Sequence, residues 1–157
     1  MKYLFIFSDG SCSWTKGVGC YALMEDLVSK KDEKGKEILP LNFILSHTHK
    51  STEMEFVTIL SALDHAVQSK KFDAIILYTD CARFVQYATF EIYLPRKQIA
   101  GGIDIDTDKR LKEHFSKLKI TVVKVKGHKK KSLMTTREQE IFGVVDKEAR
   151  QRLRSSI

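Results

Sequence analysis

A chain of 157 residues with 43% hydrophobic content can bury a core of its own, which excludes a wholly disordered protein. Lys and Arg outnumber Asp and Glu by 27 to 20, and this net charge of +7 favours a polyanionic partner, nucleic acid before an anionic membrane surface. The three cysteines form no CxxC pair, and no stretch approaches the ~18 apolar residues of a membrane span, so we expect a cytoplasmic protein without a disulfide framework or a membrane anchor.

The first part of the chain predicts a three-stranded antiparallel meander followed by a helix. Residues 2–8 form a short apolar run, and residues 17–28 and 37–47 resemble two further strands joined by a charged tip that contains a glycine. In residues 51–71 the apolar side chains recur every three to four positions, as they do on the buried face of a helix.

The second part of the chain predicts alternating strands and helices. In order, we expect a buried central strand over 72–79, helices over 81–94 and 106–119, a strand over 120–126 and a short basic helix over 144–154. Residues 127–143 show no clear periodicity, and we expect a long loop over 129–145, between His128 and Asp146. The sequence therefore predicts one α/β domain over residues 1–157, with helices packed on the faces of a mixed sheet.

Four acidic residues lie at or near the ends of these expected elements. Asp9 ends the first strand, Glu55 lies in the first turn of the first helix, Asp80 follows the central strand, and Asp146 opens the last helix. The carboxyl end of a strand is the edge at which open α/β sheets place ligands. The acids are therefore candidates for one shared site.

Each acid also has a purely structural interpretation. Asp9 and the glycine after it form a pair typical of hairpin turns. Glu55 fits the second half of a capping box that begins at Thr52. Asp80 and Asp146 both precede helical sequence and can cap it.

Taken together, the acids favour metal chemistry. Asp9 and Asp80 follow buried runs, where a charge is costly unless something pairs with it, and acids that meet at one edge repel each other unless cations lie between them. Carboxylate oxygens suit Mg²⁺ or Mn²⁺, and two such ions about 3.5–4 Å apart can hold the attacking and leaving oxygens of a phosphodiester. The pattern predicts a metal-dependent phosphodiesterase acting on nucleic acid.

Five motifs in order, FSDGSC, EMEF…ILSAL, LYTDC, VKGH and VDKEARQ, resemble type 1 ribonuclease H from about residue 2 to residue 154. The resemblance implies a ribonuclease H-like fold, with a mixed five-stranded sheet and helices on both faces. It also implies an endonuclease that hydrolyses the RNA strand of RNA–DNA hybrids and leaves 3′-hydroxyl and 5′-phosphate ends. In the family two Mg²⁺ ions, with Mn²⁺ as a substitute, are held by acids that correspond to Asp9, Glu55, Asp80 and Asp146, and His128 matches a loop histidine that assists proton transfer or product release.

The resemblance also implies where nucleic acid is bound. The residues concerned flank the acids in sequence or lie in the basic loop, and they are Gly10, Ser11, Thr15, Ser51, Thr52, Lys129 and Lys130. Trp14, in the loop after Asp9, is either a packing anchor or a residue that stacks on a sugar or a base.

The chain departs from the family where the substrate is read. Ser51 and Thr52 replace a pair of asparagines, and Ala82 replaces a glutamine, so forked amides give way to single hydroxyls and a methyl group. Two alternatives to hybrid cleavage therefore stay open: a related phosphodiesterase that acts on other structured RNA or DNA, and a ribonuclease H-like module that binds nucleic acid without cutting it. Nothing in the sequence predicts an oligomeric state.

Overall fold

The structure, a computed structural model, describes residues 1–48, 50–95, 103–126 and 136–155. A five-stranded mixed sheet lies at its centre, with the strands in the order β5-β2-β1-β6-β7. Their bounds are β1 (Tyr3–Cys12), β2 (Gly17–Met24), β5 (Leu41–Ser46), β6 (Ala74–Thr79) and β7 (Ile120–Lys124). β2 pairs antiparallel with both β1 and β5, whereas β6 pairs parallel with β1 and β7 pairs parallel with β6. The predicted meander with added parallel strands is confirmed.

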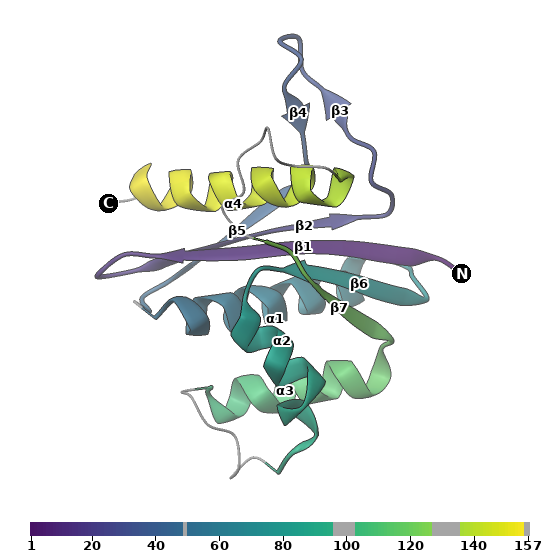
Figure 1. The fold of residues 1–157 in the computed structure, drawn as a ribbon, viewed down its shortest axis with the longest axis vertical. Helices are drawn as coiled ribbons and strands as arrows, with labels where there is room; N and C mark the ends of the chain where they lie inside the picture. Colours follow the sequence, from purple (N-terminus) through teal and green to yellow (C-terminus); the bar gives the residue numbers. More distant parts are fainter. Residues whose placement is uncertain (49, 96–102, 127–135, 156–157) are drawn as a thin grey trace.

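Helices cover both faces of the sheet, as predicted. α1 (Ser51–Ser69), α2 (Ala82–Thr89) and α3 (Ile105–Lys117) lie on one side of the sheet, and α4 (Arg137–Ser155) lies on the other (Figure 1). The buried side chains accordingly form two clusters, one of which packs between the sheet and α1 while the other packs between the sheet and α4. Within the described ranges, no helix has both the length and the apolar character needed to cross a membrane.

Residues 25–40 differ from the two long strands expected there. A separate hairpin, β3 (Lys30–Lys31) with β4 (Glu37–Ile38), projects beyond α4 (Figure 1). Pro40 has no amide hydrogen to give to a ladder and stands between β4 and β5, so the single predicted strand is divided. The base of the hairpin is fixed to α4 by Arg137, whose Nε donates to the Leu27 carbonyl oxygen at 2.7 Å.

The last helix begins earlier than predicted. α4 starts at Arg137, so residues 137–143 are helical, and Asp146 lies in the middle of the helix instead of opening it. The signal was an apolar residue at every fourth position, because Ile141, Val145, Ala149 and Leu153 are all buried. The expected loop of residues 129–145 is therefore wrong over 137–145, and residues 127–135 lie outside the described residues.

The expected helix over 81–94 is shorter than predicted. α2 ends at Thr89, and a single 3₁₀ turn, η1 (Glu91–Tyr93), follows before Pro95. The expected helix over 106–119 corresponds to α3, where Asp104 is the N-cap and its carboxylate accepts from the Thr107 amide at 3.3 Å.

Candidate active site

Asp9 lies within β1 and not at a turn. β1 runs on through Gly10 to Cys12, and Asp9 is paired with Cys20 of β2. The turn comes later, where the Ser13 amide donates to the Lys16 carbonyl oxygen at 2.8 Å. The interpretation of Asp9 as a hairpin-turn residue is therefore wrong, and so is the expectation that the first strand ends there.

Asp80 stands beside Asp9 because of the strand register. β1 and β6 run in parallel, with Phe7 opposite Tyr78, and continuing this register by two residues brings Asp80 level with Asp9. Since side chains alternate along a strand, Asp9 shares the face of Phe7, which is the face that α4 covers. β6 ends at Thr79, as predicted, so Asp80 directly follows its carboxyl end.

Glu55 comes from the opposite face, and small residues in the sheet make its approach possible. A Cβ on Gly10 would lie 3.2 Å from Met54 Cγ, and a Cβ on Gly19 would lie 2.0 Å from Thr58 Oγ1. The first turns of α1 therefore rest directly on backbone. This contact lets the Gly10 amide donate to Glu55 Oε1 at 3.1 Å.

The capping box proposed for the start of α1 does not form. Lys50 is the N-cap, without a side-chain cap hydrogen bond, and Glu55 turns to Gly10 instead. Asp80 does not cap α2 either, because its N-cap is Cys81. Asp146, in mid-helix, caps nothing.

Three of the four acids meet at one point. One carboxylate oxygen from each of Asp9, Glu55 and Asp80 lies within 4.8 Å of those from the other two. Asp9 and Glu55 are buried, at 3% and 7% exposure, while Asp80 is half-buried and opens the cluster to the surface. These oxygens come from β1, from α1 and from the residue after β6, so the cluster exists only in the folded chain.

Burial and mutual repulsion dominate the electrostatics of this cluster. The pKa of Asp9 is raised far above its ordinary value, first by burial and then by the charge of Glu55. Burial also raises the pKa of Glu55, although the hydrogen bonds from Asp9 and from the Gly10 amide oppose the shift. Among the described residues, Glu55 Oε2 has no hydrogen-bond partner. Such an arrangement calls for positive charge.

Asp146 joins the cluster from α4, next to Asp9. It is 4% exposed, and a hydrogen bond with its side chain is one of the causes that raise the pKa of Asp9. Its Oδ2 accepts from Arg150 Nη2 at 3.1 Å, one helical turn further on. Arg150 therefore pairs with an acid of the cluster. The i, i+4 spacing was the signal for this pair.

The other expected site residues surround the cluster unevenly. Ser11 lies in β1 and is half-buried, and Thr15 is exposed in the β1–β2 turn. Ser51 and Thr52 form the first turn of α1, the first exposed and the second half-buried. Gly10 holds Glu55 through its amide.

The basic loop lies outside this description. His128, Lys129 and Lys130, expected to assist catalysis or to bind nucleic acid, fall outside the described residues. Their expected roles stay predictions.

Comparisons with known proteins agree with this geometry. The family model described as RNase H matches residues 1–153. No curated protein sequence matches the chain.

Solved structures share the fold at low identity. LC11-RNase H1 in complex with an RNA/DNA hybrid matches with a TM-score of 0.66 and 10% identity, covering 98% of each chain. The N-terminal RNase H domain of rv2228c from Mycobacterium tuberculosis matches with a TM-score of 0.66 and 11% identity, covering 99% of each chain. The protease-reverse transcriptase of prototype foamy virus matches with a TM-score of 0.65 and 16% identity over 96% of this chain, which spans 20% of that protein.

Proposed function

Because the chain belongs to the RNase H family and is thereby an endoribonuclease of the ribonuclease H type, we propose that it hydrolyses the RNA strand of RNA–DNA hybrids with the help of two divalent metal ions. In this proposal Asp9, Glu55, Asp80 and Asp146 hold the ions. The products carry 3′-hydroxyl and 5′-phosphate ends.

One observation carries the proposal. Three carboxylates from separate parts of the chain have oxygens within 4.8 Å of one another, and two of these acids are buried. A buried cluster of like charges opposes folding unless a cation compensates it. A protein that only packed or only bound a polyanion would have no use for such a cluster.

The donor set fits a hard divalent cation. All four acids offer oxygen, the ligand atom that Mg²⁺ prefers and Mn²⁺ accepts, and Glu55 Oε2 is a buried acceptor without a hydrogen-bond partner among the described residues. When bound, such ions lower the pKa of water and offset the charge that develops on a phosphodiester. We propose Mg²⁺ as the ion used.

The chain's own residues keep the site in place. The Gly10 amide orients Glu55 by donating to one carboxylate oxygen, which leaves the second for a ligand. Arg150 orients Asp146 in the same way from α4. Burial of Asp9 keeps bulk water away from the inner side of the cluster, while the half-buried Asp80 marks the side from which substrate enters.

The net charge of +7 supports a nucleic acid as the substrate. The similar LC11-RNase H1 was solved with an RNA/DNA hybrid bound. We propose that Gly10, Ser11, Thr15, Ser51 and Thr52 contact the strand from β1, the β1–β2 turn and α1. His128, Lys129 and Lys130 are proposed to act from the loop before α4. We also propose that residues 1–157 form a single domain and that the protein acts in the cytoplasm.

A cleavage assay with matched substrates tests the proposal. The purified protein is incubated with Mg²⁺ and end-labelled RNA–DNA hybrid, double-stranded RNA or single-stranded RNA, beside an Asp80→Asn variant as the control. We expect cuts in the RNA strand of the hybrid alone, loss of cutting in the variant and in EDTA, and 5′-phosphate on the downstream fragments. Tight binding of hybrid without any cutting would contradict the proposal.

A second candidate is a phosphodiesterase of the same chemistry that acts on other structured nucleic acids. It is favoured by Ser51, Thr52 and Ala82, which cannot form the forked amide contacts of asparagine or glutamine. Equal cutting of double-stranded RNA and hybrid in the same assay would select this candidate.

A further inference from the structure

The chain's only tryptophan stands out from the molecule. Trp14 is 95% exposed, the highest value among the exposed large hydrophobic side chains of the described residues. A packing role is thereby excluded, although an indole this exposed to water is unfavourable by about 25 cal/mol per Å² of apolar surface. A ligand that covers the ring would recover this free energy.

The loop that carries Trp14 is short and held at its base. The Ser13 amide donates to the Lys16 carbonyl oxygen at 2.8 Å, and the Ser13 hydroxyl donates to the same oxygen at 3.3 Å. Below the turn, β1 and β2 are paired as far as Cys12 and Gly17. The ring is therefore presented on a supported tight turn and not on a long loop.

The same base is packed against α1, next to the acids. A Cβ on Gly17 would lie 2.6 Å from Met54 Sδ, so the start of β2 rests on the residue before Glu55. The turn that carries Trp14 is thus connected to the candidate active site in two ways. It follows β1, which contains Asp9, and its base packs against α1, which contains Glu55.

The distance from the acids suits an extended polymer. Trp14 lies five positions after Asp9, which at about 3.3 Å per residue places it within about 17 Å of the cluster along the strand direction. A nucleic acid strand advances 3.4 Å per nucleotide along a duplex, so this reach corresponds to roughly five nucleotides.

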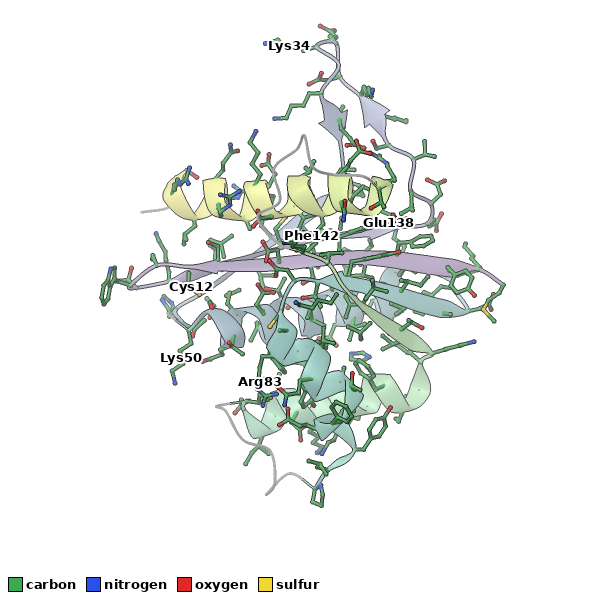
Figure 2. The ribbon with its side chains drawn as sticks, in the orientation of Figure 1. Cys12, Lys34, Lys50, Arg83, Glu138 and Phe142 are labelled. Atoms are coloured by element: carbon green, nitrogen blue, oxygen red, sulfur yellow. The ribbon has the colours of Figure 1, made fainter. Side chains whose placement is uncertain are left out.

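Positive charge lies at the same end of the molecule. Lys16 closes the turn, and Lys50 is exposed at the N-cap of α1. Figure 2 shows Lys50 and Cys12, the last residue of β1, near each other at this end. Lysines and an exposed aromatic ring on one part of a surface are a combination that binds the backbone and the flat faces of nucleic acids.

We infer that Trp14 is a nucleic-acid contact which packs its indole on a sugar or base of the bound strand, roughly five nucleotides from the bond that is cut. The inference rests on the proposed function, since it takes the acid cluster as the point of cleavage. Its ligand is an extended polynucleotide, and a mononucleotide is too short to reach both places.

A fluorescence titration tests the inference directly, because Trp14 is the sole source of tryptophan emission. The Asp80→Asn variant, in Mg²⁺, is titrated with a blunt RNA–DNA hybrid of 18 base pairs and, separately, with the same hybrid carrying a single-stranded overhang. Binding is followed in parallel by the anisotropy of a dye on the hybrid. We expect the tryptophan emission to be quenched in proportion to the bound fraction. If the ring packs on sugars, the blunt hybrid will quench it. If the ring stacks on an unpaired base, only the hybrid with the overhang will quench it.

Substitutions supply the second readout. Trp14→Ala is expected to weaken hybrid binding and raise KM about tenfold while leaving kcat unchanged, because a tenfold change corresponds to about 1.4 kcal/mol, within the range of base–aromatic stacking. Trp14→Phe keeps a ring and should restore most of the affinity. Tyr3→Ala, at the opposite end of β1 and 41% exposed, is the matched control and should change neither value.

The outcomes separate the two proposals. If the anisotropy reports binding while the tryptophan emission and the affinity of Trp14→Ala stay unchanged, the role of Trp14 is overturned and the nuclease proposal stands. If the wild-type protein neither binds nor cuts hybrid, the proposed function fails first.

Discussion

Two pairs of residues that lie two positions apart along β1 and along the segment of β6 and Asp80 show opposite physical chemistry. Phe7 of β1 and Tyr78 of β6 face each other in the register, and their rings stack with centroids 4.6 Å apart and an interplanar angle of 6°. Asp9 and Asp80 follow in the same register and bring two carboxylates together at the same face. The aromatic pair therefore stabilises the folded state, whereas the acidic pair two residues further on destabilises it.

The two pairs lie in differently packed parts of the sheet. The aromatic pair lies under α4 with Ile141, Phe142 and Val145, and Figure 2 shows Phe142 pointing from that helix toward the sheet. The acidic pair lies where β6 has ended and where β1 continues with no strand of the described residues paired to it on that side. Stability comes from the closed part of the sheet, and the candidate site occupies the open part.

Loss of one acid is expected to have the largest effect. Asp80→Asn keeps the shape of the side chain but removes a charge that the cations need, so kcat should fall on the order of 10²–10³-fold or more. Because the same change relieves repulsion with Asp9 and Glu55, the variant should unfold at a higher temperature than the wild type in EDTA. Single-turnover cleavage and thermal unfolding measure the two effects, and an active variant would remove Asp80 from the site.

Loss of one ring should produce the converse result. Phe7→Ala leaves a cavity under α4 and is expected to lower the free energy of unfolding by about 3–5 kcal/mol, measured in urea. At a temperature where the variant remains folded, its kcat should stay close to that of the wild type. A large loss of kcat in folded protein would show that the two levels of the sheet are not separable.

A methyl group on Gly19 should disturb both regions less strongly. Its Cβ would lie 2.0 Å from Thr58 Oγ1 and 2.8 Å from Ile44 Cγ1, so α1 must move away from the sheet. We expect a loss of about 1–3 kcal/mol in stability together with weaker Mg²⁺ binding, because Glu55 moves with the helix. Calorimetric titration measures the affinity for Mg²⁺. An unchanged affinity would show that Glu55 does not bind the ions.

The smallest effect is a pH dependence of the metal-free protein. The pKa values of Asp9 and Glu55 are raised in the folded state, so the folded chain binds more protons than the unfolded chain above pH about 4, the ordinary carboxyl value. Stability in EDTA should therefore be greatest at low pH and fall as the pH rises from about 5 to 8. Asp9→Asn should flatten this slope and stabilise the metal-free protein at pH 8, because it removes a buried acid beside Glu55. Thermal unfolding across this pH range measures the slope for the wild type and for the variant. A stability that rises with pH would show that the pKa values of Asp9 and Glu55 are not raised in the folded state.

Much of the fold could be predicted from the sequence because its signals are local. The apolar runs of β1 and β6 and the helical repeat of α1 are each visible within about twenty residues, and their order restricts the sheet to few arrangements. The start of α4 could not be predicted as readily, because residues 137–140 are all polar and the first apolar residue of the helix is Ile141. The division of β4 from β5 was indicated by Pro40 alone.

The candidate site was predictable as a set of acids but not as a geometry. Asp9 could be a turn residue or a metal ligand, depending on how far β1 continues. The length of β1 is determined by its pairing with β2, which the sequence does not show. The path of Glu55 across the sheet depends on Gly10 and Gly19, whose missing side chains look in the sequence like ordinary flexibility. Arg150 was visible at four residues from Asp146, although its pairing required the helix to be placed first.

The position of α4 bears on how the protein is made. Of the described helices it alone covers one face of the sheet, and it follows all five strands of the sheet in the chain (Figure 1). Until α4 has been synthesised, the sheet carries an uncovered apolar surface that includes Phe7 and Tyr78, which pack against residues of α4 in the folded chain. A gene shortened ahead of Arg137 should therefore yield aggregates in the cell, and supplying the missing helix as a separate peptide should recover soluble product.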